Sequence, residues 1–123
     1  MVTGENKTNE ELGGGGERGN TPQRPVAYAI SAVEGFTDEA TVRRYAELAG
    51  PAIEHFGGRF IVSNAEPVVV EGESPSGHLS IVEFPSIEHA KAWYDSPEYA
   101  EARAITPATF RGRLLMFAEG ATA

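Results

Sequence analysis

Two side chains in one short apolar segment have the chemistry for proton transfer. Residues 78–84 read HLSIVEF, with His78 at the start and Glu83 near the end. A carboxylate among apolar neighbours holds its proton more strongly and can act as a general acid or base. An imidazole can gain or lose a proton near neutral pH. Glu83 and His78 are therefore the candidate catalytic residues, and the alternative for Glu83 is an ion pair with an arginine such as Arg111 or Arg113.

The loop before His78 supplies a candidate partner. Residues 71–77 read EGESPSG, a run of turn residues that predicts a hairpin loop, so Glu71 and His78 flank the same turn. A histidine beside a carboxylate is the usual form of an oriented general base. The alternative is a solvent-exposed pair without a role. Glu83 is expected on the opposite face of the strand from His78, because side chains alternate.

Aromatic and polar side chains elsewhere are candidate ligand contacts. Aromatic rings wall many ligand sites, and a buried phenol or indole needs a hydrogen-bond partner. The alternative is that these rings simply fill the core. The candidate substrate-binding residues are Tyr28, Tyr45, Arg59, Glu71, Trp93 and Tyr99.

The composition argues against several kinds of site. The chain has no cysteine, which excludes disulfides, thiolate nucleophiles and zinc–thiolate sites. His55, His78 and His89 are far apart and lack metal-ligand spacing, so we expect no metal and no cofactor. A haem or oxygen enzyme is the weakest functional class, because only these histidines could be axial ligands.

The charge balance bears on partners. The chain has 18 acidic and 10 basic residues and a net charge of -8. Scattered basic residues on an acidic protein disfavour nucleic acid and anionic membranes. No apolar run approaches the roughly 20 residues that span a bilayer, and the N-terminus lacks the apolar stretch of a signal peptide. We expect a cytoplasmic protein that binds a small molecule and neither nucleic acid nor membrane.

The elements that must position these residues follow the order β-α-β-β-α-β. Residues 1–25 contain four consecutive glycines and predict a disordered tail, followed by one domain over residues 26–123. Strands are predicted at 26–33, 59–70 (with a bulge or bend at 64–67), 78–84 and 113–119. One helix is predicted from an N-cap at Thr37 to Gly57, with a kink or break near Pro51. A second is predicted in two pieces, 86–94 and 97–104, stopped at Thr106–Pro107.

This order predicts an α+β fold of the ferredoxin-like type: an antiparallel four-stranded sheet with two helices on one face. The strands are apolar on both sides. In the last strand, for example, Leu114 and Met116 oppose Leu115 and Phe117. A sheet with one bare apolar face is expected to pair with a copy of itself. The sequence therefore predicts a homodimer whose sheets face each other, as in a dimeric α+β barrel.

Several short motifs resemble one bacterial family over residues 26–120. They are Gly57-Gly58-Arg59-Phe60, Glu71-Gly72, Glu83-Phe84-Pro85-Ser86, Ala92-Trp93-Tyr94, Ser96-Pro97-Glu98-Tyr99 and a closing Glu119-Gly120. In this order they resemble domain of unknown function 1330, within the dimeric α+β barrel superfamily. The resemblance implies a ferredoxin-like fold and dimerisation. The wider superfamily includes cofactor-free monooxygenases, lactone isomerases, polyketide cyclases and haem enzymes, so a shared fold does not fix the reaction.

Two positions depart from that family. Its members typically carry arginines where this chain has His78 and Thr106, which suggests a less anionic substrate. We expect a cofactor-independent enzyme of the isomerase, cyclase or lyase type, acting by acid–base chemistry on a small, partly apolar metabolite. The alternative is a non-catalytic dimeric module that binds a ligand or serves in stress.

Overall fold

The computed structural model describes residues 25–73 and 77–121. The predicted tail, residues 1–25, thus lies outside the described residues except for Pro25. The elements are β1 (Ala27–Val33), β2 (Gly35–Phe36), α1 (Glu39–His55), β3 (Arg59–Ala65), β4 (His78–Phe84), α2 (Ile87–Asp95), α3 (Pro97–Thr109), β5 (Phe110–Arg111) and β6 (Leu114–Glu119). The predicted element order is confirmed, with the short strands β2 and β5 added.

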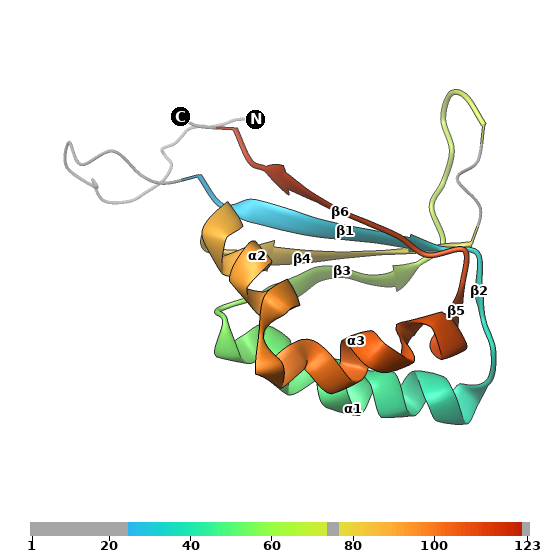
Figure 1. Cartoon of the computed structure of the whole chain (residues 1–123). Helices are drawn as coiled ribbons and strands as arrows, with labels where there is room; N and C mark the ends of the chain where they lie inside the picture. The colour runs from blue at the N-terminus through green and yellow to red at the C-terminus, as the bar shows by residue number, and fades with distance from the viewer. Residues whose placement is uncertain (1–24, 74–76, 122–123) are drawn as a thin grey trace.

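Four strands form one antiparallel sheet in the order β3-β4-β1-β6. This is the strand order of the split-βαβ plan. Figure 1 shows all three helices on one face of the sheet, which we call the inner face. No helix of the described residues covers the opposite, outer face. The predicted ferredoxin-like α+β fold is confirmed.

The sheet is apolar on both faces, as the alternation of side chains predicted. On the inner face, Ala29 pairs with Val82, and both are buried. On the outer face, Ile30 pairs with Ile81 and with Met116, and Met116 is 47% exposed. A strand period of two separates the two sets. The outer face is therefore a broad apolar surface in the single chain.

The N-cap of the first helix lies one residue later in the chain than predicted. The N-cap is Asp38, whose carboxylate accepts a hydrogen bond from the backbone N–H of Thr41 at 2.8 Å. The predicted cap, Thr37, instead donates its hydroxyl to the carbonyl of Ala108 at 2.7 Å. Thr37 thus ties the start of α1 to the end of α3, a contact that local sequence does not reveal.

Prolines do not end the helices. α1 continues through Pro51, without the break that was one expectation there, and α3 continues through Pro107 to Thr109. The predicted stop at Thr106–Pro107 is wrong. Proline removes a backbone donor from a helix. In α3 the hydroxyls of Thr106 and Thr109 donate to carbonyls one turn earlier, at 3.1 and 2.7 Å, so side chains add hydrogen bonds around the proline.

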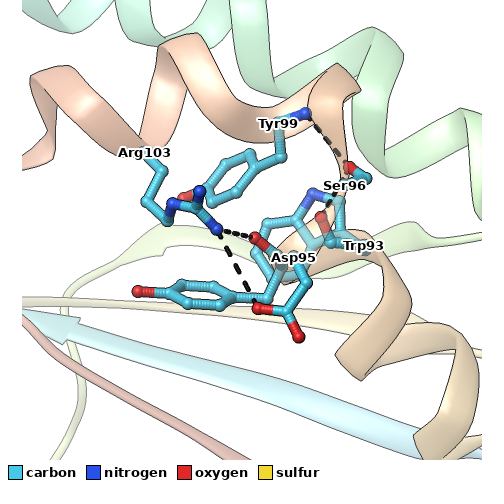
Figure 2. A network of polar contacts seen from close by, with 6 residues as sticks. Trp93, Asp95, Ser96, Tyr99 and Arg103 are labelled. Carbon is cyan, nitrogen blue, oxygen red and sulfur yellow. Dashed lines mark hydrogen bonds and ion pairs between the residues drawn. The ribbon is translucent and has the colours of Figure 1, made fainter.

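Ser96 divides the second helical segment in two, as predicted. Its hydroxyl donates to the carbonyl of Trp93 at 2.8 Å and accepts from the N–H of Tyr99 at 3.1 Å (Figure 2). The same residue therefore ends α2 and caps α3. Arg103 reinforces this corner by donating to the carbonyl of Tyr94 at 2.6 Å.

The second long strand is shorter than predicted. β3 ends at Ala65 after two register shifts, and Asn64 adopts a left-handed backbone with φ of 50°. The N–H of Asn64 bonds the hydroxyl of Ser80 at 2.8 Å instead of a backbone carbonyl. This predicted bulge turns the chain away from β4. Val68 and Val70, expected in the strand, are 88% and 93% exposed in the connection that follows.

Candidate functional site

A cavity of about 220 Å³ lies between the inner face of the sheet and α1. Small residues leave this space: Ala29, Ser31 and Ser80 on the sheet lie opposite Ala46 and Gly50 on the helix. Protein interiors are close-packed and hold few voids larger than a water molecule. The other walls are mostly aliphatic and aromatic, which is the usual lining of a small-molecule site.

The short strands β2 and β5 close one end of this cavity. Phe36 pairs with Phe110, and their ring centroids lie 5.7 Å apart. Arg111 donates to the carbonyl of Phe36 at 2.9 Å and fixes the pair. Tyr45 of α1 meets the Phe110 ring edge-on at 4.9 Å. The pair was not predicted, because two-residue strands have no periodicity to recognise.

Arg113 is the cation of the cavity wall. Its Nε donates to the hydroxyl of Ser31 at 3.2 Å, and its Nη1 donates to the hydroxyls of Tyr99 at 3.3 Å and Thr106 at 3.4 Å. The guanidinium also lies over the rings of Tyr45 and Phe110. Among the described residues, no carboxylate pairs with it. Three hydroxyls and two rings therefore surround a half-buried charge that has no counter-charge in the part of the chain that the structure describes.

Two phenol side chains form a hydrogen bond with each other beside this arginine. The hydroxyls of Tyr45 and Tyr99 lie 2.7 Å apart. Burial raises the pKa of Tyr45 and outweighs the opposing effect of the Arg113 charge. Burial acts to lower the pKa of Arg113, but Tyr45 and Tyr99 outweigh it, so that this pKa is raised. At neutral pH the wall therefore presents a charged guanidinium beside the neutral phenol of Tyr45.

His78 lies in the cavity wall at the start of β4. Its cross-strand partner on β1 is Val33, and its ring stacks on Phe36 with centroids 5.9 Å apart. Its Nδ1 is buried without a hydrogen-bond partner among the described residues. The predicted pair with Glu71 does not form within the described chain. Glu71 is exposed in the connection that leaves the sheet after β3, whereas His78 packs against Phe36.

Glu83 lies on the outer face, away from the cavity. Its carboxylate accepts from the Nε of Arg59 at 2.9 Å, between directly paired positions of β4 and β3. The ion-pair alternative is therefore observed, but with Arg59 in place of Arg111 or Arg113. The predicted separation of Glu83 and His78 onto opposite faces is confirmed. Tyr28, the partner of Glu83 on β1, lies in the same outer row.

The cavity thus brings together only part of the predicted set. His78, Tyr45 and Trp93 line it, and Tyr99 reaches it through its hydrogen bonds to Tyr45 and Arg113. The predicted contacts that lie elsewhere are Tyr28, Arg59, Glu71 and Glu83. Arg113 was missed as a site residue. Arg113 is two residues before Leu115, which also lines the cavity, and residues two apart in a strand share a face. This spacing was the signal that could have identified Arg113.

The other two histidines lie outside the cavity. His55 is exposed at the end of α1, 3.5 Å from the carboxylate of Glu98, and His89 contacts the hydroxyl of Ser86 at 2.7 Å. In the described ranges, no three histidine or acidic side chains gather as a metal site would need. Nor does any described helix combine the length and apolar character needed to cross a membrane.

Solved structures share this fold at low sequence identity. The protein RPA0582 of Rhodopseudomonas palustris, described as of unknown function, has a TM-score of 0.61 and 19% identity, covering 83% of this chain and 87% of its own. A dimeric protein of unknown function from Bacteroides fragilis, with a ferredoxin-like fold, has a TM-score of 0.52 and 16% identity, covering 77% and 96%. The hypothetical Arabidopsis thaliana protein AT3G17210 has a TM-score of 0.56 and 13% identity, covering 83% and 93%.

No curated protein matches the sequence. The family model "Domain of unknown function (DUF1330)" matches residues 26–121, which span the whole sheet and all three helices. This match agrees with the motifs and with the strand order. The chain therefore belongs to the DUF1330 family.

Proposed function

We propose that this protein is a cofactor-independent enzyme that moves a proton on a small, mainly apolar substrate held in the cavity. One observation carries the proposal: a mainly apolar cavity contains both an imidazole with a buried, unpartnered nitrogen and a guanidinium without a counter-charge among the described residues. Native proteins keep few buried polar atoms without partners, and such atoms often belong to sites completed by a ligand or water. Perturbed polar groups in an apolar pocket are the usual mark of an active site.

The positions of the two groups suit proton abstraction next to a carbonyl. His78 pairs with Val33, and Arg113 precedes Leu114, which pairs with Ala32 on the other side of β1. The two residues are thus two strand spacings apart, or roughly 10 Å between backbones. A ring nitrogen of His78 would take a proton from the carbon next to the carbonyl. The C–H electron pair would form a new C=C bond, and the carbonyl π pair would move onto oxygen to give an enolate. The charge of Arg113, which lies in the same cavity, would stabilise the negative charge of this enolate electrostatically.

Return of the proton to a different carbon completes an isomerisation. Attack of the enolate carbon on a second carbonyl carbon of the same substrate gives a cyclisation, in which that C=O π bond opens and the new alkoxide takes the proton back from His78. Both reactions begin with the same proton abstraction. The residues therefore support proton abstraction next to a carbonyl more strongly than they support isomerisation or cyclisation in particular. The second candidate is a non-catalytic dimer that holds a ligand. It is favoured by one feature: within the described residues no carboxylate orients His78, although a general-base histidine usually has such a partner.

Deuterium wash-in separates the two candidates without knowledge of the natural substrate. Small ketones and keto acids are incubated with the full chain in D₂O, and α-deuteration is followed by proton NMR. We expect wild-type protein to accelerate exchange for some members of the panel, and His78→Gln to lose this acceleration. His55→Gln is the matched control, because His55 lies outside the cavity. Binding without exchange in the wild type would contradict the enzyme and favour the ligand-holding dimer.

We also propose that the working unit is a homodimer built on the outer face. The apolar positions there form rows that cross the sheet, such as Ile30, Ile81 and Met116. Large exposed apolar patches mark interaction surfaces, and self-pairing is the commonest arrangement of soluble oligomers. The printed description of the Bacteroides fragilis structure as dimeric supports the same assembly.

A further inference from the structure

We infer that the ligand of the cavity is a compact monocarboxylate, whose carboxylate binds Arg113 while its apolar body lies along the inner face. The inference rests on the proposed use of the cavity and adds the chemical class of the molecule that fills it. Four features of the described residues support it: the missing counter-charge, the geometry around the guanidinium, the charge of the cavity wall, and its size.

Arg113 is set apart because it has no acidic partner although it is half-buried; Arg43 and Arg111 also have none among the described residues, but both are exposed. Arg44 and Arg59 each lie 2.9 Å from a glutamate oxygen, and Arg103 lies 4.0 Å from Asp95. Those arginines are more exposed, with 53%, 72% and 38% of the side chain accessible, yet each has an acidic partner. Arg113 is half-buried and has none in the described chain. Burying a charge without a partner is costly, and a bound carboxylate would remove that cost.

The geometry leaves one edge of the guanidinium for a ligand. The hydroxyls of Ser31, Tyr99 and Thr106 accept from Nε and Nη1, and the Tyr45 hydroxyl also interacts with the guanidinium. Nη2 makes no well-formed hydrogen bond among the described residues. The Tyr45 and Phe110 rings lie 5.5 and 5.2 Å from the guanidinium carbon and only 4.9 Å from each other, so both pack on the same side of it. A ligand would therefore approach from the side away from these rings. A carboxylate is a planar acceptor of matching shape.

The charge of the wall selects a single negative charge. Arg113 is the one lysine or arginine among the described lining residues, and that lining contains no aspartate or glutamate. A dianion such as a phosphate monoester would bring a second charge that meets only His78. A neutral molecule would leave the guanidinium without a counter-charge. A monoanion matches this wall best.

The cavity size limits the rest of the molecule. An apolar cavity of about 150 Å³ takes a benzene ring, so 220 Å³ takes one ring with a short arm, or a short branched chain. Ile53, Phe60 and Trp93 supply the apolar wall beyond Ala29. Ala29 lies four residues before Val33 on β1. This apolar end of the cavity is therefore roughly 13 Å from the end where Arg113 lies. One carboxylate at the Arg113 end and one small apolar body directed toward the other end can therefore share this cavity.

Matched acids and amides test the inference on the full chain. Binding of phenylacetate, phenylacetamide and phenyl phosphate is measured by titration calorimetry at one ionic strength. We expect phenylacetate to bind about ten- to a hundred-fold more tightly than phenylacetamide, the range of a charge-assisted hydrogen bond. Phenyl phosphate is expected to bind more weakly than phenylacetate. Arg113→Met should remove the preference for the acid, and Arg113→Lys should keep part of it.

Arg103→Met is the matched control, because Arg103 also stacks on a tyrosine, at 5.3 Å from the Tyr94 ring, but does not line the cavity. It should leave the preference unchanged. Should Arg113→Met fail to fold, the acid–amide comparison on wild-type protein decides alone. If acid and amide bind equally and Gly50→Leu abolishes the binding of both, the monocarboxylate inference is wrong. The proposal that the cavity binds a small molecule would then still hold. Absence of binding by all three probes and by the wash-in panel would overturn both proposals.

Discussion

At the scale of single residues, the face of the strand decides which groups can act together. His78 and Glu83 belong to the same strand, yet His78 lines the cavity while Glu83 forms an ion pair with Arg59 on the outer face. Arg113 lines the cavity because it is two residues before Leu115 and shares its inner face of the sheet. The chemistry of the site therefore depends on a two-residue period and on cross-strand neighbours.

The buried phenol of Tyr45 predicts a loss of stability in alkali. A phenol of the unfolded chain ionises near pH 10, and burial raises the pKa of Tyr45 in the folded protein. The unfolded state then releases its proton first, so the free energy of unfolding falls as pH rises above about 10. Tyr45→Phe should flatten this fall, measured as melting temperature from pH 8 to 11. Tyr94→Phe, at a partly exposed tyrosine, should keep the wild-type slope; equal slopes in both variants would contradict the account.

Part of the candidate site follows from the sequence, and part depends on contacts between distant segments. His78, Tyr45 and Trp93 were predicted because reactive or aromatic side chains in apolar segments are visible locally. Arg113 was not, because its hydroxyl partners come from β1 and α3, 82, 14 and 7 residues away. Glu71 was misplaced because the irregular end of β3 sets where its loop goes.

At the scale of elements, two glycines, Gly50 inside α1 and Gly58 just after it, distinguish the effect of side-chain packing on stability from the effect of backbone flexibility. A Cβ at Gly58 would lie 2.7 Å from Phe84 and 2.8 Å from Ile53, whereas a Cβ at Gly50 would meet nothing within 4 Å. Gly58→Ala should therefore destabilise the protein by roughly 1–3 kcal/mol through overpacking. Gly50→Ala should stabilise it by about 0.5–1 kcal/mol, since alanine favours a helix. Urea unfolding of both variants checks this, and a Gly58→Ala protein as stable as wild type would contradict it.

Most elements were predictable because their signals are local. The strand at 78–84 and the caps Ser86 and Ser96 were found from alternation and from capping residues followed by acidic ones. The errors share a non-local cause. The hydroxyl of Thr37 bonds the carbonyl of Ala108 instead of capping α1. The strand β2 forms only because β5 pairs with it. No window of sequence contains both members of either pair.

At the scale of the whole molecule, the outer face predicts assembly. Leu114 and Met116 are 56% and 47% exposed in the single chain and alternate on the outer side of β6. Replacing both by lysine should turn a dimer into a monomer, because charges would be buried where two sheets meet. Light scattering coupled to size-exclusion chromatography at micromolar concentration measures the mass directly.

The control for this prediction is the double variant Ala92→Lys, Ala104→Lys, which adds the same charges at exposed positions of α2 and α3. It should keep the wild-type mass, since the helices lie on the other side of the sheet (Figure 1). A wild-type monomer at these concentrations, or a dimer that survives both outer-face lysines, would rule out assembly through this face.

The central claim, that a small molecule occupies the cavity, has a built-in reporter. Trp93 is the single tryptophan of the chain, and it lines the cavity, so one indole N–H signal reports on the site. Small carboxylates and their amides are titrated into ¹⁵N-labelled full-length protein, with Gly50→Leu as the variant that fills the cavity. The account predicts a saturable shift of the Trp93 signal in the wild type and none in Gly50→Leu. Saturable binding that leaves the Trp93 signal unmoved, or that persists in Gly50→Leu, would contradict it.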